Sequence, residues 1–117
     1  MTYAALQNSS GAFVLPTLEA TSRAANAPMP DDLRVTVVNT PDPAGYPIAG
    51  FTWLLVYREQ DDPVKGRALV DLLWWVVHDG QELAAELDYT PLPEDVVRMV
   101  EEKIASITYR GEPLLKR

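Results

Sequence analysis

The stretch YPIAGFTWLLVY, residues 46–57, decides the fold. If this stretch is extended, Leu54 and Val56 fall on one face and Trp53 and Leu55 fall on the other. A strand that is apolar on both faces is typical of the interior of a sheet that helices cover. The stretch therefore predicts a buried strand and an α/β fold in which strands pack with helices.

Short elements are predicted before this stretch. Residues 3–7 and 13–15 flank the turn sequence Asn-Ser-Ser-Gly at 8–11, which predicts two short extended pieces joined by a turn. Residues 17–27 are rich in Ala and are followed by Pro, which predicts a short helix. Residues 33–38 contain three Val between polar turn residues, which predicts a strand.

Helices are predicted after this stretch. An Asp-Pro pair at 62–63 supplies an N-cap and a first helical residue, and Gly80 suits a left-handed stop, so a helix is expected over 63–79. A shorter helix is expected over 81–87. The sequence Pro-Glu-Asp at 93–95 begins another helix, because its carboxylates favour the positive end of the helix dipole. The C-terminal part is thus predicted to be mostly helical.

The composition excludes several classes of partner. The chain has 117 residues, with 17 acidic and 10 basic side chains, and a formal net charge of −7. A pI near 4.5 disfavours nucleic acid and anionic membranes, because few cations are available to neutralise phosphates. The chain has no Cys, so it has no disulfide or thiolate metal site. Its first residues carry no signal-peptide pattern, with neither a basic region nor an apolar one.

No constellation of residues predicts catalysis or metal binding. His78 is expected to cap a helix C-terminus, since a hydrogen-bonding side chain favours the unpaired carbonyls there. The adjacent carboxylates at 61–62 and 101–102 diverge, so they are interpreted as a cap and a solvated face. We therefore expect no enzyme, no metal and no cofactor. Core or partner-facing packing is expected for most of the three tryptophans, Trp53, Trp74 and Trp75.

The motif order resembles one known family. From residue 46 onward the sequence is similar to the C-terminal part of the phosphate-binding subunit of phosphate ABC importers, the PstS family, and residues 2–25 are similar to it too. Nearly the whole chain takes part, which makes the resemblance more specific than any single motif. The matching motifs are Tyr46-Pro47-Ile48, the Asp-Pro-x-x-Gly of 62–66, the Trp pair at 74–75, the Leu-Asp-Tyr of 87–89 and the Leu-Pro-Glu-x-Val-Val of 92–97.

The resemblance implies a partial periplasmic-binding-protein-like fold, namely the C-terminal third of a two-lobed protein. Residues 1–40, with strands and a short helix, would be a piece of the second lobe. Residues 41–47 would be the crossover, with Tyr46, Pro47 and Ile48 as the hinge residues. Residues 48–117 would be the C-terminal part of the first lobe, with the buried strand and helices.

The resemblance also implies a function. The chain would contribute to capture of inorganic phosphate only together with its N-terminal part, because the family's phosphate ligands lie upstream and none has a counterpart here. Partners would be phosphate and the ABC permease subunits, in a periplasmic or extracellular, membrane-associated location. The alternative is a stand-alone interaction module or homo-oligomer without phosphate binding, which uses exposed apolar surface.

Overall fold

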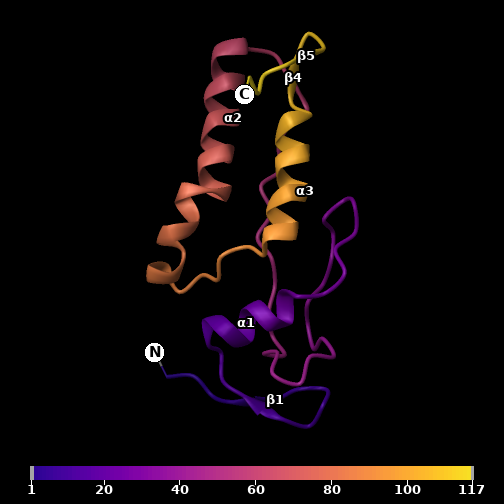
Figure 1. Ribbon diagram of the computed structural model, residues 1–117, viewed down its shortest axis with the longest axis vertical. Helices are drawn as coiled ribbons and strands as arrows, with labels where there is room; N and C mark the ends of the chain where they lie inside the picture. Colours follow the sequence, from indigo (N-terminus) through magenta and orange to yellow (C-terminus); the bar gives the residue numbers. More distant parts are fainter. Residues whose placement is uncertain (1, 117) are drawn as a thin grey trace. The chain divides into compact units, whose positions relative to one another are not determined.

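The computed structural model describes residues 2–116, and these residues form three α-helices and two small β-sheets (Figure 1). The chain divides into two compact units. The first unit runs up to Trp53 and includes Ala84–Pro93, and the second comprises Leu54–Leu83 with the residues from Glu94 onward. The mixture of helices and strands confirms the predicted α/β class.

The first unit contains the predicted hairpin. β1 (Leu6–Gln7) pairs antiparallel with β2 (Phe13–Val14), and Leu6 lies opposite Val14. The turn between the strands requires a positive φ, which Gly11 adopts at 85° without a steric penalty. The Asn-Ser-Ser-Gly sequence thus makes the tight connection that its turn residues predicted.

The same unit contains the predicted short helix. α1 (Leu18–Ala25) begins after Thr17, whose hydroxyl accepts a hydrogen bond from the N–H of Ala20 (3.1 Å). Ala20 and Ala24 are buried on one side of the helix. Val37, from the segment that follows the helix, is also buried. The small side chains of α1 allow neighbouring backbone to approach closely.

The second unit is built on two helices that pack against each other, α2 (Pro63–Val77) and α3 (Glu94–Ala105) (Figure 1). Asp62 caps α2, because its Oδ1 accepts hydrogen bonds from the N–H groups of Val64 (2.8 Å) and Lys65 (3.1 Å). Both helices confirm the predicted starts. The aliphatic core of this unit consists of Val70, Val77, Val96, Ile104, Ile107 and Leu114.

A small sheet closes the second unit. Its strand order is β3-β4-β5, with β3 at Glu59–Gln60, β4 at Thr108–Tyr109 and β5 at Glu112–Pro113. β3 runs parallel to β4, with Glu59 opposite Thr108, and β5 is antiparallel to β4. The sheet therefore joins the segment before α2 to the segment after α3.

The structure corrects the prediction around Gly80. α2 ends at Val77 with His78 as its C-cap, and Gly80 does not adopt a left-handed conformation. The predicted helix over 81–87 is instead two short 3₁₀ segments, η1 (Asp79–Leu83) and η2 (Ala85–Leu87). Neither segment buries a residue, so no apolar face stabilises a regular α-helix there.

Two predicted strands are absent from the described residues. Residues 33–38 and 46–57 form no strand, and much of the second stretch is exposed instead of buried. Leu55 is 97% exposed. A buried strand needs hydrogen-bonded neighbours and covered faces, and β4 begins only at Thr108, directly after α3. The described chain thus supplies no adjacent strand to pair with 46–57.

Candidate functional site

The segment that the resemblance makes a crossover lies in the first unit and is tied down by backbone hydrogen bonds. The N–H of Tyr46 donates to the carbonyl of Ala20 in α1 (3.0 Å), and the carbonyl of Pro47 accepts from the N–H of Asn39 (2.8 Å). Pro47 is buried, whereas Ile48 is 66% exposed. The chain is therefore anchored as far as Pro47 and becomes exposed at the next residue.

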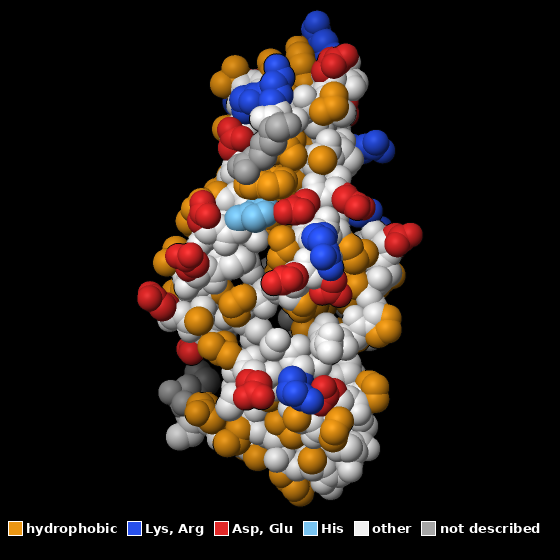
Figure 2. All heavy atoms as spheres, viewed as in Figure 1, with side chains coloured by type: hydrophobic (Ala, Val, Ile, Leu, Met, Phe, Trp, Pro, Cys, Tyr) orange, Lys and Arg blue, Asp and Glu red, His pale blue; other side chains and the backbone are white. Residues whose placement is uncertain are grey.

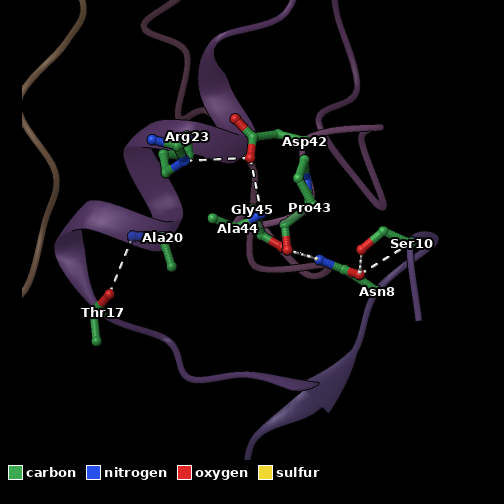
Figure 3. A network of polar contacts seen from close by, with 9 residues as sticks. All are labelled: Asn8, Ser10, Thr17, Ala20, Arg23, Asp42, Pro43, Ala44 and Gly45. Atoms are coloured by element: carbon green, nitrogen blue, oxygen red, sulfur yellow. Dashed lines mark hydrogen bonds and ion pairs between the residues drawn. The ribbon is translucent and has the colours of Figure 1, made fainter. Parts of the chain in front are cut away.

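A buried amide side chain connects the β1–β2 turn to this segment (Figure 3). Asn8 is 6% exposed, and its Nδ2 donates to the carbonyls of Pro43 (2.9 Å) and Gly45 (3.2 Å). Its Oδ1 accepts from the N–H and hydroxyl of Ser10 (3.1 and 2.6 Å) and from the N–H of Ala12 (3.2 Å). All the polar capacity of this amide is thus used inside the protein.

An ion pair holds the same turn from the side of α1 (Figure 3). Arg23 Nε lies 3.2 Å from Asp42 Oδ1, and this oxygen also accepts from the N–H of Ala44 (2.8 Å). The hydrogen bond from the Ala44 N–H is the largest cause of the lowered pKa of Asp42. Partial burial opposes this shift, and the Arg23 guanidinium lowers the pKa further. The carboxylate therefore acts as an ionised clamp between α1 and the 42–45 turn.

A small polar cavity of about 190 Å³ adjoins this clamp. Its lining includes Arg23 and Asp42 together with Ser22, Asn26 and Pro93. The charges in the lining neutralise each other, so the cavity offers no net charge to an ion. Within residues 2–116 no three His, Asp or Glu side chains converge as metal ligands do. The arrangement is suited to holding the segment rather than to chemistry on a ligand.

His78 is the C-cap of α2, as the sequence predicted, and it also reaches α3. Its Nδ1 lies 2.7 Å from the carbonyl oxygen of Trp74, and its Nε2 lies 2.7 Å from Glu101 Oε1. The imidazole stacks on the Trp74 ring, with centroids 4.4 Å apart and planes at 16°. The ring therefore packs on α2 through Trp74 and joins α2 to α3 through its contact with Glu101.

The other candidate residues serve structural purposes. Asp62 is a helix cap, as predicted. Trp53 is half-exposed and donates its Nε1–H to the carbonyl of Leu33 (3.0 Å). Trp75 is 44% exposed. Two of the three tryptophans therefore present apolar surface, and their partner-facing role stays a prediction.

Three long-range side-chain contacts were not predicted from the sequence. The Asn8 amide, the Asp42 clamp and the pairing of Glu101 with His78 all join residues far apart in the chain. Local signals existed for the first two, because Asn-x-Ser and Asp-Pro-x-Gly sequences favour side-chain-capped turns. Glu101 carried no such signal, because the sequence around it is typical of an ordinary solvated helix face.

The mixed α/β chain, with two helices packed together and two small sheets, is compatible with a partial periplasmic-binding-protein-like fold. None of the helices within residues 2–116 has both the length and the apolar character that crossing a bilayer requires. No family model matches the chain.

Known proteins similar to this chain are phosphate-binding proteins named PstS. The protein from Xylella fastidiosa strain 9a5c is 34% identical over 109 residues, covering 91% of this chain and 30% of the relative. The protein from Pasteurella multocida is 31% identical, covering 86% and 30%. The protein from Methanocaldococcus jannaschii is 37% identical, covering 82% and 28%. The chain thus spans about 30% of the length of these relatives.

These similarities fit a C-terminal segment of a PstS protein, and they confirm the resemblance that the motifs predicted. The match extends over most of the chain instead of one motif, so both compact units take part in it.

Proposed function

We propose that this chain contributes one part of the phosphate-binding protein of an ABC importer, and that it captures inorganic phosphate only together with the rest of a PstS protein. The observation that carries the proposal is the relation of lengths: 91% of this chain matches a relative of which it covers only 30%. The relatives that match this chain are named phosphate-binding proteins.

The internal use of polar groups supports the second half of the proposal. A phosphate site needs donors that point at the anion and are otherwise unpaired. Here Arg23 is paired with Asp42, and the Asn8 amide is spent on backbone groups. Neither side chain is therefore assigned to the anion, and by resemblance the family's phosphate ligands lie upstream of this chain.

The proposed organisation follows the family's two lobes. Residues 1–40 would belong to the second lobe, 41–47 to the crossover and 48–117 to the first lobe. The hinge would be at Tyr46, Pro47 and Ile48, where anchored backbone gives way to exposed chain. The complete protein would lie in the periplasm or outside the cell, associated with the membrane, and deliver phosphate to the ABC permease subunits.

A second candidate is a homo-oligomer without phosphate binding. The observation that favours it is the number of large apolar side chains at the surface, which Figure 2 shows as orange patches on the visible face. Exposed apolar side chains recruit partners, and a second copy of the same chain is always available as one. Multi-angle light scattering distinguishes this candidate, because it predicts a mass that rises with concentration.

The test of the proposal is equilibrium dialysis with labelled phosphate. One sample is the 117-residue chain, and the other is a joined protein in which this chain replaces the matching segment of the Xylella fastidiosa PstS protein. We expect phosphate to bind the joined protein and not the chain alone. A joined protein that folds but binds no phosphate would contradict the proposal.

A further inference from the structure

We infer that His78 and Glu101 form a proton-dependent link between α2 and α3: the imidazole is held as its doubly protonated cation, and the link weakens when that proton leaves. Both residues and the stacked Trp74 lie in the second unit. The link therefore needs neither phosphate nor the rest of a PstS protein, and it is independent of the proposed function.

The two ring nitrogens of His78 both face acceptors. Nδ1 lies 2.7 Å from the carbonyl oxygen of Trp74, and Nε2 lies 2.7 Å from Glu101 Oε1. A carbonyl oxygen and an ionised carboxylate can only accept, and a neutral imidazole carries a hydrogen on only one nitrogen. The two contacts together therefore require one more proton. We assign it to the ring, because a free imidazole holds a proton about two pH units more tightly than a free carboxyl does.

The end of α2 explains why Nδ1 meets a carbonyl. His78 leaves the helical region, with φ −119° and ψ −99°. Its N–H donates to the carbonyl of Trp75 (3.2 Å), whereas a continuing α-helix would direct it to the carbonyl of Trp74. The ring Nδ1 occupies that donor position instead. A cation is favoured there, because the C-terminal end of a helix carries partial negative charge.

The stacking of the imidazole on Trp74 also favours the cation. The ring centroids lie 4.4 Å apart and the planes meet at 16°. The face of an indole attracts a cation within about 6 Å of its centroid more strongly than other aromatic rings do. The side chains of His78 and Glu101 are about 30% exposed, so water screens their attraction only in part. The surroundings of the ring therefore stabilise its charged form.

The charged groups near the ring come from three elements. α3 presents Glu101, the one carboxylate within ion-pair distance of the imidazole among residues 2–116, and Figure 2 shows the pale-blue ring beside a red side chain. Arg98, one turn earlier on α3, opposes the cation but forms no ion pair within the described chain. Asp79 in η1 and Asp71 in α2 are exposed and add negative charge. The charge in contact with the ring is thus negative.

A proton that is held more tightly in the folded chain makes stability depend on pH. The ordinary pKa of an imidazole is about 6.5. Because folding strengthens proton binding here, the contribution is fully present below that value and is lost as the pH rises through the higher folded-state value. The link is therefore strongest in mildly acidic solution and weakest in alkaline solution.

Nuclear magnetic resonance of the 15N-labelled chain tests the proton directly. The chain has one His, so its ring signals need no further assignment. At about pH 7 we expect both ring nitrogens to be protonated, with a titration midpoint at least about one pH unit above 6.5. A midpoint at or below about 6.5 would overturn the inference, and so would an unprotonated Nε2 at about pH 7.

Glu101→Gln removes the negative charge and keeps the shape of the side chain. We expect the midpoint of His78 to return to about 6.5 or lower in this variant. Glu102→Gln, on the adjacent exposed residue, is the matched control and should leave the midpoint within about 0.3 pH units, because water screens an exposed charge. Equal midpoints in the natural chain and Glu101→Gln would contradict the assigned partner.

Urea unfolding of the same proteins measures the effect on stability. The unfolding equilibrium constant of Glu101→Gln, divided by that of the natural chain, should fall about tenfold between about pH 6 and about pH 9, since one pH unit of tighter proton binding is a factor of ten. The corresponding ratio for Glu102→Gln should stay constant. A Glu101→Gln ratio that is the same at both pH values would overturn the inference, because a contact without a bound proton would not respond to pH.

Discussion

The amide of Asn8 donates to the carbonyl of Pro43, 35 residues later in the sequence, at 2.9 Å. This contact and its companion to Gly45 join a hairpin turn to the segment that precedes the proposed hinge. Because the amide is buried and satisfied on both its oxygen and its nitrogen, the turn and the segment form one structural unit. The Asn8 side chain therefore holds the hairpin turn against the 43–45 segment.

Asn8→Ala should therefore lower the free energy of unfolding by about 2–3 kcal/mol, since it leaves buried backbone groups without partners. Urea denaturation followed by circular dichroism measures this change. The matched control is Ser9→Ala, which removes an exposed hydrogen bond to the Thr40 carbonyl and should cost less than about 0.5 kcal/mol. Equal stabilities of the two variants would show that the Asn8 contacts are dispensable.

Gly66→Ala tests the close packing of α2 on the small sheet. A Cβ at this buried position would lie 2.7 Å from Leu114 Cδ1 and 3.0 Å from Gln60 Cβ. We expect a loss of about 1 kcal/mol, because overpacking exceeds the gain in helix propensity. In a Leu114→Ala background the same substitution should become neutral or stabilising. Gly50→Ala, where nothing lies within 4 Å of the added Cβ, is the control.

The contact between His78 and Glu101 should couple α2 to α3. A double-mutant cycle of His78→Ala and Glu101→Ala is expected to give a coupling free energy of about 1 kcal/mol, since both side chains are about one-third exposed and partly screened. Glu102→Ala, on the adjacent exposed residue, should show no coupling to His78. A cycle that closes to zero would mean that the 2.7 Å contact does not contribute to stability.

Stability should fall with acid partly through Asp62. The backbone N–H groups of Lys65 and Val64 hold the pKa of this carboxyl below its ordinary value of 3.8. A lowered folded-state pKa means that the contribution is present above the unfolded-state pKa and is lost as the pH falls through the folded-state pKa. Asp62→Asn keeps a cap whose strength does not depend on pH, so the stability advantage of the natural chain should shrink on acidification.

Urea midpoints of the natural chain and Asp62→Asn, measured from neutral pH down to about pH 2, check this expectation. Asp61→Asn changes the neighbouring exposed carboxyl and serves as the control. A difference between the natural chain and Asp62→Asn that stayed constant with pH would contradict the assigned cap.

Local signals predicted the helix starts and the hairpin turn of this chain. The Asp62 cap, the turn that ends at Gly11 and the start of α3 all depend on residues close together in sequence, so the sequence contains their causes. The strand predicted over 46–57 was wrong for a physical reason. Its apolar pattern specifies an interior strand, but a strand forms only where neighbours exist, and the described chain offers none beside Leu55.

The contacts that organise the candidate site were the least predictable. Arg23 and Asp42, like His78 and Glu101, are far apart in the sequence and become partners only through the fold. The lobe assignment and the hinge at Tyr46, Pro47 and Ile48 stay predictions, because they concern the arrangement of a longer protein.

Titration calorimetry of the 117-residue chain with inorganic phosphate tests the central claim most directly. The claim is that this chain carries no phosphate site of its own and gains the function only with the rest of a PstS protein. We predict no binding heat at neutral pH, with a complete PstS protein under the same conditions as the positive control. Binding by the isolated chain at micromolar concentration or tighter would contradict the account.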